Sequence, residues 1–319
     1  MAIKEFDCLI IGGGPAGLNS ALYATRAGLT CGIIDLYSMG GTPVNYCEIE
    51  NYLGFNKING FLLSQKFEEH IDCFNIEKFP FQEIQELDLT SEIKKIKTLD
   101  NEFLAKTVII AAGASPKKLG ILGEEENIGK GVSYCAVCDG IFYKEKVVAV
   151  IGGGASALEE AEYLTKFANK VYLIHRRDEF RADKLIQNRA KSNNKIEFIL
   201  NSIPVEILAN DKVNALKIKN IKTNEDKIIN VDGVFPYIGL SANSKDFAKY
   251  LNLDENGFIK TDIYMRTHIQ GVYAVGDIRN TPLRPVITAV ADGAIAGVEA
   301  SKYIANLEET RKNESISLW

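Results

Sequence analysis

The sequence has few cysteines for its length, and only two of them lie close together. Six cysteines occur in 319 residues, far below the density of small secreted domains that disulfides hold together. One Cys-x-x-Cys pair stands in "YCAVCDG" at residues 134–140, whereas the other cysteines and all three histidines are scattered singly. A structural zinc site usually needs two such pairs, or one pair with nearby histidines. We therefore expect neither a disulfide framework nor a metal centre, which leaves redox chemistry for the pair.

Long apolar runs and an excess of basic residues are also absent. No apolar run approaches the ~18 residues that a membrane-spanning helix needs. The first apolar run ends at Gly12, before it could form the core of a secretion signal. The net charge of −5 lacks the basic excess typical of nucleic-acid-binding proteins. We therefore expect a soluble cytoplasmic protein with no membrane or nucleic-acid partner, in which a lasting Cys-x-x-Cys disulfide would be catalytic.

Residues 7–35 predict a strand, a helix and a second strand that bind a dinucleotide. The apolar run from Cys8 to Ile11 leads into G-x-G-x-x-G, and a helical pattern and the apolar run from Cys31 to Ile34 follow. The first glycine allows a tight turn, the second lets the backbone approach a pyrophosphate, and the third lets helix and strand pack closely. The pyrophosphate lies at the helix N-terminus, and an acid about 20 positions on binds the ribose. The predicted residues are Gly12, Gly14, Pro15, Ala16, Gly17 and Asp35.

The same strand–helix–strand pattern returns 140 residues later, but the residues at the end of its second strand differ. The third glycine becomes Ala157, which the pattern tolerates, and Asp35 corresponds to His175, followed by two arginines. A carboxylate accepts a free ribose hydroxyl, whereas guanidinium groups pair with a 2′-phosphate, so the second site favours NADPH. Arg181 could reach the same phosphate if the chain is helical there, although any single arginine could simply be solvated. The predicted residues are Gly152, Gly154, Ala155, Ser156, Ala157, His175, Arg176, Arg177 and Arg181.

The C-terminal part of the chain indicates which dinucleotide the first site binds. The stretch "GVYAVGD" at residues 271–277 predicts a short strand that ends in Gly276-Asp277, and a helical pattern begins at Val286. An aspartate at the end of a strand and beside a helix N-terminus can bind a polar chain such as the ribityl group of a flavin. It could also be an ordinary loop residue. The first dinucleotide is therefore predicted to be FAD.

The motifs and their order resemble the low-molecular-weight thioredoxin reductases of bacteria, over essentially the whole chain. The first fingerprint, "CAVCDG", the second fingerprint, "HRRDEFR" and "GVYAVGD" follow one another as in that family. The cysteine pair is the most specific part, because other flavin-dependent disulfide reductases carry theirs just after the first fingerprint. The stretch "ENYLGF" is similar to the family's flavin-side loop.

The resemblance implies an α/β protein with two Rossmann-like dinucleotide-binding domains, the NADPH domain inserted into a discontinuous FAD domain. The FAD domain would comprise residues 1–117 and 245–319, the NADPH domain with the cysteines residues 118–244, and the protein would be a homodimer. Further FAD-binding residues implied by the resemblance are Gly40, Gly41, Thr42, Asn51, Ala112, Gly113, Gly276, Asp277, Arg284, Pro285 and Val286.

The resemblance also implies the course of the reaction. Electrons would pass from NADPH through FAD to the Cys135/Cys138 disulfide and, by thiol–disulfide exchange, to thioredoxin or a related small redoxin. Cys138 would face the flavin, Cys135 would attack the partner, and Asp139 would be the general acid, although Asp139 could instead cap a helix. In the family the NADPH domain rotates between two arrangements, so the junctions at residues 116–120 and 239–244 are expected to act as hinges.

Some positions depart from the family, and three alternatives stay open. Thr42 and Pro285 stand where the family commonly has glutamine. The run "GEEEN" is expected to be a solvated turn, and the end "RKNESISLW" either a disordered tail or an aromatic lid. A flavin-dependent dithiol oxidase or a ferredoxin-fed reductase would have the same fold, but the clustered arginines and the intact second fingerprint count against them. A redox-sensing binding module would not consume NADPH steadily.

Overall fold

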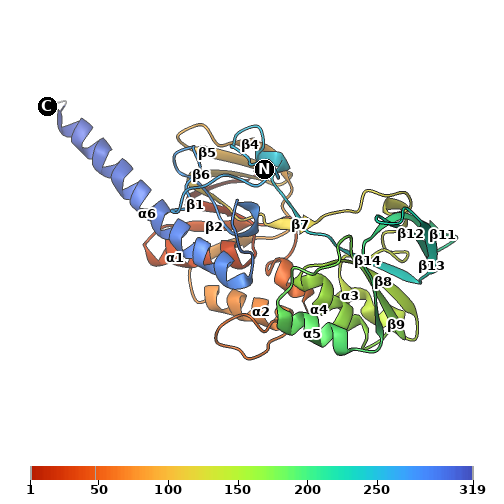
Figure 1. The fold of residues 1–319 in the computed structure, drawn as a ribbon. Helices are drawn as coiled ribbons and strands as arrows, with labels where there is room; N and C mark the ends of the chain where they lie inside the picture. Colours follow the sequence, from red (N-terminus) through yellow and green to blue (C-terminus); the bar gives the residue numbers. More distant parts are fainter. Residues whose placement is uncertain (1, 47, 318–319) are drawn as a thin grey trace. The chain divides into compact units, whose positions relative to one another are not determined.

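The chain folds into two compact units, the second inserted into the first. The structure is a computed structural model that describes residues 2–46 and 48–317, with side chains described up to residue 310. Unit 1 comprises residues 1–115 and 241–319, and unit 2 comprises residues 116–240. The two units are distinct in the ribbon view (Figure 1). The observed α/β fold thus has the discontinuous organisation that the sequence predicts.

Unit 1 is built on a seven-stranded sheet in the order β3-β2-β1-β6-β5-β4, with β16 also paired to β6. The strands β1, β2, β3, β6 and β16 run parallel, and β4 and β5 are antiparallel to their neighbours. The strand bounds are β1 Ala2–Ile11, β2 Cys31–Ile34, β3 Ile76–Phe79, β4 Ile84–Asp88, β5 Lys94–Thr98, β6 Asn101–Ile110 and β16 Val272–Ala274. The prediction of a strand at residues 31–34 is confirmed.

Side chains of β1 alternate between two apolar cores. Cys8 and Ile10 pack with the helices, whereas Leu9 and Ile11 pack with Phe247 and other residues of the C-terminal segment. This alternation follows from the period of two in a strand. Because both faces of the sheet are covered, the strand reads as the continuous apolar run seen in the sequence.

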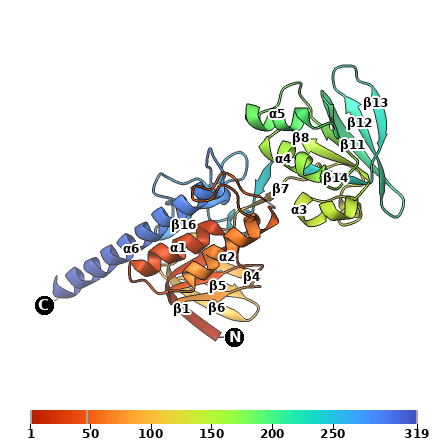
Figure 2. The same ribbon diagram turned by 90° about the horizontal axis from the view of Figure 1, so that it is seen from below.

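The α-helices in the described residues of unit 1 are α1 (Pro15–Arg26), α2 (Gly60–Ile71) and α6 (Val286–Ser317). Helices α1 and α6 lie side by side along one face of the sheet (Figures 1 and 2). Glycine permits this close approach, because a Cβ at Gly293 would lie 2.3 Å from the carbonyl oxygen of Ala16. Helix α6 begins at Val286, as predicted, and continues through residues 311–317, where a disordered tail was expected; Trp319 lies outside the described residues.

Unit 2 combines a four-stranded parallel sheet, β10-β9-β8-β14, with a three-stranded antiparallel sheet, β11-β12-β13. Its strands are β8 Val147–Gly152, β9 Lys170–Ile174, β10 Ile196–Ile199, β11 Ser202–Ala209, β12 Val213–Asn220, β13 Asp226–Asn230 and β14 Gly233–Tyr237. Its helices are α3 Ala136–Asp139, α4 Ala155–Leu164 and α5 Lys184–Ser192. Val148 and Val150 face the helices, and Ala149 and Ile151 face the antiparallel sheet, so unit 2 repeats the two-faced core of unit 1.

The two crossings between the units pair with each other. Strand β7 (Ala114–Pro116) leaves unit 1, strand β15 (Leu240–Ala242) returns to it, and the two form a two-stranded sheet.

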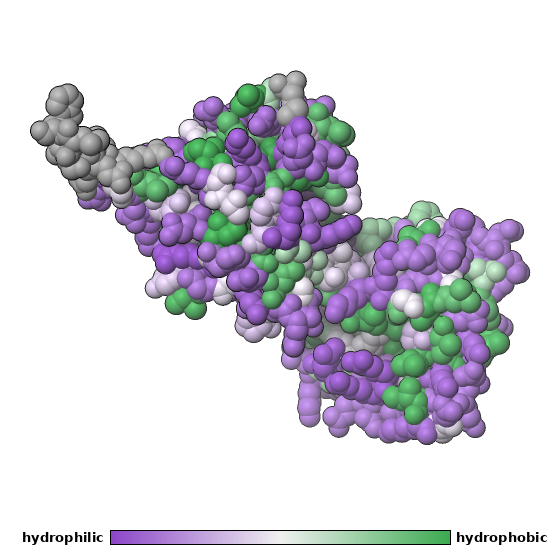
Figure 3. All heavy atoms as spheres, turned by 90° about the horizontal axis from the view of Figure 1, so that it is seen from above, coloured by the Kyte–Doolittle hydropathy of each residue, from purple (hydrophilic) through white to green (hydrophobic). Residues whose placement is uncertain are grey.

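On the face shown in Figure 3, hydrophilic residues predominate and hydrophobic ones stand in small groups. Within the described residues, no helix has the length and apolarity that crossing a membrane would require.

Candidate active site

The cysteine pair stands at the start of a short helix in unit 2. Cys135 and Cys138 are joined by a disulfide, with their Cα atoms 5.3 Å apart. Cys135 is the N-cap of α3, and its Sγ accepts a hydrogen bond from the backbone N–H of Cys138 at 3.1 Å. Cys138 is exposed and Cys135 is half-buried.

Hydrogen bonds to the neighbouring strand fix the cysteine loop within unit 2. The backbone N–H of Ala136 donates to the Tyr237 hydroxyl at the end of β14, over 3.0 Å. Ser133 Oγ accepts from the backbone N–H of Cys135 at 3.1 Å, and the Ser133 N–H donates to Val234 of β14 at 3.1 Å. The redox pair is therefore held in one orientation relative to the parallel sheet.

Asp139 directly follows the exposed cysteine. It stands before the 3-10 helix at residues 140–143, but its side chain makes no capping hydrogen bond, so the capping alternative finds no support. Its carboxylate lies near Tyr143, whose pKa is raised to about 12 by burial and also by the charges of Asp139 and Asp232. The next two side chains are apolar and exposed, Ile141 by 61% and Phe142 by 68%.

In the run "GEEEN", Glu125 and Glu126 are exposed, as expected of a solvated turn, but Glu124 is not. Glu124 is only 1% exposed, and its carboxylate accepts hydrogen bonds from the backbone N–H groups of Leu119 and Gly120, each at 2.7 Å. It also accepts from the hydroxyl of Tyr134, the residue before Cys135, at 2.7 Å. Hydrogen bonding to three donors compensates for burying this carboxylate. Its partner Tyr134 is distant in the sequence, which is why the local pattern did not reveal it.

The first fingerprint forms a tight turn at the end of β1. A Cβ at Gly17 would lie 1.8 Å from the carbonyl oxygen of Gly12, so only glycine allows this close packing of helix on turn. Gly14 is the N-cap of α1, and Pro15 opens the helix. A Cβ at Gly14 would lie 3.6 Å from the Cα of Gly41, an ordinary van der Waals contact that would cause no clash.

Asp35 closes this turn from the end of β2. One carboxylate oxygen accepts from the backbone N–H of Gly13 at 2.5 Å, and the other accepts from that of Tyr37 at 2.7 Å. Burial raises the pKa of the Asp35 carboxyl, and these two hydrogen bonds oppose that effect. Each oxygen keeps a further lone pair with which it can accept a hydroxyl.

The glycine pair at residues 40–41 packs against the same turn. The N–H of Gly40 donates to the carbonyl of Gly13 at 2.9 Å. A Cβ at Gly41, where φ is 66°, would lie 2.7 Å from the Cα of Gly14. Thr42 then opens a 3-10 helix, residues 42–45. The structure therefore brings Gly40 and Gly41 to the first fingerprint.

Other residues predicted for the first site differ in how closely they approach it. Ala112 follows β6 and adjoins Gly12, since a Cβ at Gly12 would lie 2.9 Å from the nitrogen of Ala112. The carbonyl of Gly113 accepts from the backbone N–H of Asn243 at 3.1 Å. Asn51 is exposed in the loop closed by the bridge between residues 49 and 58.

The second fingerprint repeats the turn in unit 2. Gly154 is the N-cap of α4, and a Cβ there would meet no atom within 4 Å. Ala155 and Ser156 are exposed in the first turn, whereas Ala157 is fully buried against Gly152. A glycine N-cap at the start of the first helix therefore recurs in unit 2.

His175 differs from the other side chains predicted for this site because it points inward. The ring is buried beside Gly153, where a Cβ would lie 2.2 Å from it, and Nε2 is 3.1 Å from the carbonyl oxygen of Glu179. Burial lowers the pKa of the imidazole, and the charges of Arg181 and Arg176 lower it further. His175 thus supports the turn as a neutral ring.

The three arginines remain available beside it. Arg176 and Arg177 are exposed. The helical turn on which the reach of Arg181 to the phosphate was made conditional is not present, because α5 begins only at Lys184. A backbone hydrogen bond nevertheless holds Arg181 at the turn, since its N–H donates to the carbonyl of Gly153 at 2.9 Å.

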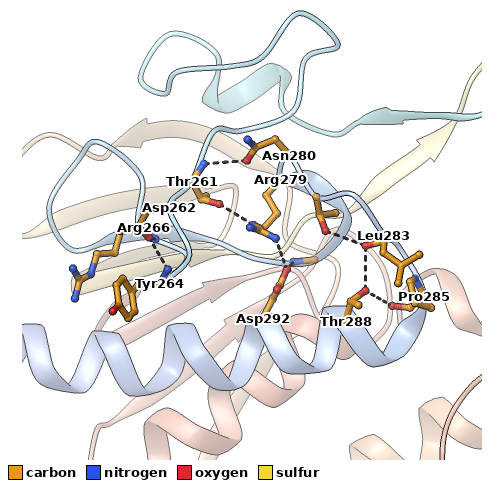
Figure 4. A network of polar contacts seen from close by, with 12 residues as sticks. Thr261, Asp262, Tyr264, Arg266, Arg279, Asn280, Leu283, Pro285, Thr288 and Asp292 are labelled. Atoms are coloured by element: carbon orange, nitrogen blue, oxygen red, sulfur yellow. Dashed lines mark hydrogen bonds and ion pairs between the residues drawn. The ribbon is translucent and has the colours of Figure 1, made fainter.

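The Gly276-Asp277 turn is braced by an ion pair that sequence reasoning missed. Asp292 of α6 accepts from the backbone N–H of Gly276 at 3.1 Å and from Arg279 at 3.2 Å. Arg279 also donates to the Thr261 hydroxyl at 2.8 Å, as Figure 4 shows. Burial raises the pKa of Asp277 to about 6; Asp292 adds to this effect and Arg284 opposes it.

The residues before α6 are ordered by aromatic and backbone contacts. The Arg284 guanidinium lies 4.2 Å from the ring centroid of Phe258. The Pro285 carbonyl accepts from the hydroxyl of Thr288 at 2.9 Å and from its N–H at 3.1 Å, and α6 begins at Val286. Proline at this position is compatible with the helix start, because no N–H is needed there.

The residues present fit two dinucleotides. Gly14 and Gly154 are the N-caps of α1 and α4, and at Gly154 a Cβ would meet no atom within 4 Å. A pyrophosphate at either helix N-terminus would receive backbone N–H groups and the favourable helix dipole. The groups beside the two turns differ in charge. Asp35 suits a free ribose hydroxyl, as in FAD, and the arginines that follow His175 suit the 2′-phosphate of NADPH.

Comparisons with known proteins agree with this arrangement. The family model of the pyridine nucleotide-disulphide oxidoreductases matches residues 6–293. The thioredoxin reductase of Bacillus subtilis is 44% identical over 310 residues, covering 97% of this chain and 98% of that protein. The thioredoxin reductase of Listeria innocua is 43% identical over 313 residues, covering 98% of each. The crystal structure of Lactococcus lactis thioredoxin reductase gives a TM-score of 0.92 at 43% identity, covering 94% of this chain and 99% of that one. This chain therefore belongs to the pyridine nucleotide-disulphide oxidoreductases and, within them, to the thioredoxin reductases.

Proposed function

We propose that this protein reduces the disulfide of thioredoxin with electrons from NADPH. The observation that carries the proposal is the Cys135/Cys138 disulfide in the same unit as the second fingerprint and its arginines. FAD and NADPH are the cofactors of the thioredoxin reductase family. The curated relatives that cover nearly the whole chain are named thioredoxin reductases.

We assign FAD to unit 1 and NADPH to unit 2. The sequence predicts the FAD domain at residues 1–117 and 245–319, and the compact units divide after residues 115 and 240. The proposed FAD-binding residues are Gly12, Gly14, Pro15, Ala16, Gly17, Asp35, Gly40, Gly41, Thr42, Asn51, Ala112, Gly113, Gly276, Asp277, Arg284, Pro285 and Val286. The proposed NADPH-binding residues are Gly152, Gly154, Ala155, Ser156, Ala157, His175, Arg176, Arg177 and Arg181, with His175 supporting the turn.

The cysteine pair and Asp139 carry out the exchange. When bound, FAD supplies the capacity to accept a hydride and to deliver an electron pair to a disulfide. The reduced pair then acts on thioredoxin: the Cys135 thiolate attacks one sulfur of the substrate disulfide, and a mixed disulfide forms. Cys138 attacks the Cys135 sulfur, which restores the pair and releases thioredoxin as a dithiol. Asp139 is next to Cys138, where it can act as the general acid that protonates the thiolate formed on the flavin side when the Cys135/Cys138 disulfide is reduced.

Two surfaces suit the proposed partners. Ile141 and Phe142 follow the cysteine helix and are exposed, so they offer an apolar contact for thioredoxin beside the reacting sulfur. In unit 1, Ile287, Ile295 and Val298 are exposed at helical spacing along one face of α6. We propose that this face contributes to a homodimer in the cytoplasm, where a dithiol can be kept reduced.

The first experiment follows NADPH absorbance in the presence of the flavin-loaded protein and thioredoxin. We expect turnover that requires thioredoxin and is lost in Cys138→Ser, whereas Cys73→Ser, which changes an exposed free cysteine, retains it. We also expect Arg177→Gln to raise the KM for NADPH and to leave the use of NADH unchanged. A wild-type flavin that ignores NADPH but is bleached by reduced ferredoxin, or by a dithiol under air, would contradict the proposal.

A further inference from the structure

The chain enters and leaves unit 2 through two short segments that are hydrogen-bonded to each other. We define the entry segment as residues 117–120 and the exit segment as residues 237–240, both of which belong to unit 2. The N–H of Lys117 donates to the carbonyl of Gly239 at 2.9 Å. The two ends of the inserted unit are therefore joined at the backbone.

A buried carboxylate links the entry segment to the residue before Cys135. Oε1 of Glu124 accepts from the N–H of Leu119, and Oε2 accepts from the N–H of Gly120, each at 2.7 Å. Oε1 also accepts from the hydroxyl of Tyr134 at 2.7 Å. Burial and this hydrogen bond raise the pKa of the Tyr134 hydroxyl, which therefore stays a donor. Its ring packs against the apolar core between the two sheets of unit 2, so the side chain is held at both ends.

A tyrosine of the exit segment holds the residue after Cys135. The hydroxyl of Tyr237 accepts from the backbone N–H of Ala136 at 3.0 Å, and Tyr237 stands two positions before Gly239. Ala136 itself is fully buried. Cys135 thus lies between two residues that are fixed to different segments, one through Glu124 and the other directly through Tyr237.

We propose that Glu124, Tyr134 and Tyr237 are positioning residues that keep the two sulfurs of the redox pair close together after the disulfide is reduced. The inference rests on the proposed function, because it takes this pair to be the redox centre. The disulfide fixes the loop covalently, whereas the loop of the dithiol depends on its hydrogen bonds. Loosening these contacts should increase the freedom of the dithiol more than that of the disulfide, which makes the disulfide harder to form.

The test measures the equilibrium between the redox pair and glutathione in the holoprotein. In this exchange the disulfide of oxidised glutathione breaks, the Cys135–Cys138 disulfide forms, and the two thiol protons of the pair pass to two glutathione thiols. Alkylation of the remaining thiols, followed by mass spectrometry, gives the reduced fraction and hence the equilibrium constant. The measurement needs neither NADPH nor thioredoxin, so it is separate from turnover.

Two tyrosine variants remove the contacts on either side of Cys135. Tyr134→Phe keeps the ring and removes a hydrogen bond to a carboxylate, so we expect the equilibrium constant for disulfide formation to fall roughly fivefold. Tyr237→Phe removes the hydroxyl that accepts from Ala136 and should lower the constant as well. The control is Tyr172→Phe, which changes a half-buried tyrosine of β9 and should leave the constant unchanged.

Two glycines with similar backbones test whether the entry segment acts through Glu124. The φ angle is 71° at Gly120 and 76° at Gly129, and a Cβ at either position would meet no atom within 4 Å. Alanine therefore strains both backbones to a similar extent. The N–H of Gly120 donates to Glu124, however, whereas that of Gly129 donates to the carbonyl of Val132. We expect Gly120→Ala to lower the equilibrium constant by about twofold or more, and to have no further effect in Tyr134→Phe, where the link is already broken.

The outcomes separate the inference from the proposed function. A lower constant in Tyr134→Phe and Gly120→Ala, with no change in Gly129→Ala, would support the positioning role. Equal constants in the wild type and Tyr134→Phe would overturn it, and so would an equal fall in the two glycine variants, which would indicate general strain. A wild-type pair that equilibrates with glutathione but passes no electrons from NADPH to thioredoxin would instead overturn the proposed function.

Discussion

The buried carboxyl of Glu160 should make the stability of unit 2 depend on pH. This side chain of α4 is 7% exposed, and its Oε2 has no hydrogen-bond partner in the described part of the chain. Burial raises its pKa from 4.5 to about 7, and the neighbouring Glu159 adds to this effect. Between pH 4.5 and about 7, Glu160 therefore stays protonated in the native state, whereas in the unfolded chain it is ionised.

Protonation of Glu160 stabilises the native state most at low pH. The stabilising contribution is fully present below pH 4.5, decreases as the pH rises to about 7, and is absent above that value. At ~1.4 kcal/mol per pKa unit, the difference is about 3 kcal/mol, an upper value because water can enter a partly open site. Glu160→Gln keeps the shape of the protonated acid and cannot ionise, so it should exceed the wild type in stability by up to ~3 kcal/mol at pH 8.

Urea unfolding of the holoprotein between pH 4.5 and 8.5 measures this difference, with fluorescence and circular dichroism as separate probes because two units unfold. We expect the free energies of unfolding of the wild type and Glu160→Gln to converge towards pH 4.5 and to differ increasingly above pH 6. Glu159→Gln is the control, because that neighbouring side chain is exposed and should show a much smaller dependence on pH. A Gln variant that is no more stable than the wild type at pH 8 would refute the reasoning, since Glu160 would then be stabilised as an anion.

Three further predictions concern the site. Phe142→Ala should raise the KM for thioredoxin by roughly fivefold or more, because an exposed ring beside the cysteines is removed, while stopped-flow absorbance shows unchanged flavin reduction by NADPH. Glu124→Gln should lower the free energy of unfolding by about 1–3 kcal/mol, because an amide nitrogen cannot accept from the buried N–H groups; Glu125→Gln at the surface should change it little in the same urea titration. Arg279→Leu should cost about 3 kcal/mol, since Asp292 is left buried without its cation, and should speed the release of FAD in dialysis, with partial recovery in Arg279→Lys.

The sequence by itself determined the features that depend on residues close together in the chain. The apolar run at residues 31–34 became β2, and the helical pattern from Val286 became α6. Strand and helix preferences, the tight turns that need glycine and the Cys-x-x-Cys spacing are all local, so they can be read directly. The fingerprint occurs twice, with an aspartate after the second strand in one copy and a histidine and arginines in the other, which indicated two dinucleotide sites. Together with the order of the motifs, it also indicated the family that the comparisons confirm.

The tertiary structure decided the features that depend on distant partners. The sequence gives no sign that Glu124 accepts from Tyr134, that Asp292 accepts from Gly276, or that Oε2 of Glu160 is buried with no hydrogen-bond partner in the described part of the chain. Arg181 lies before α5, and a backbone hydrogen bond to Gly153 of the fingerprint holds it at the turn. Burial and long-range pairing set the cost of a charge and the orientation of a side chain, and both arise only when segments far apart in the chain pack together.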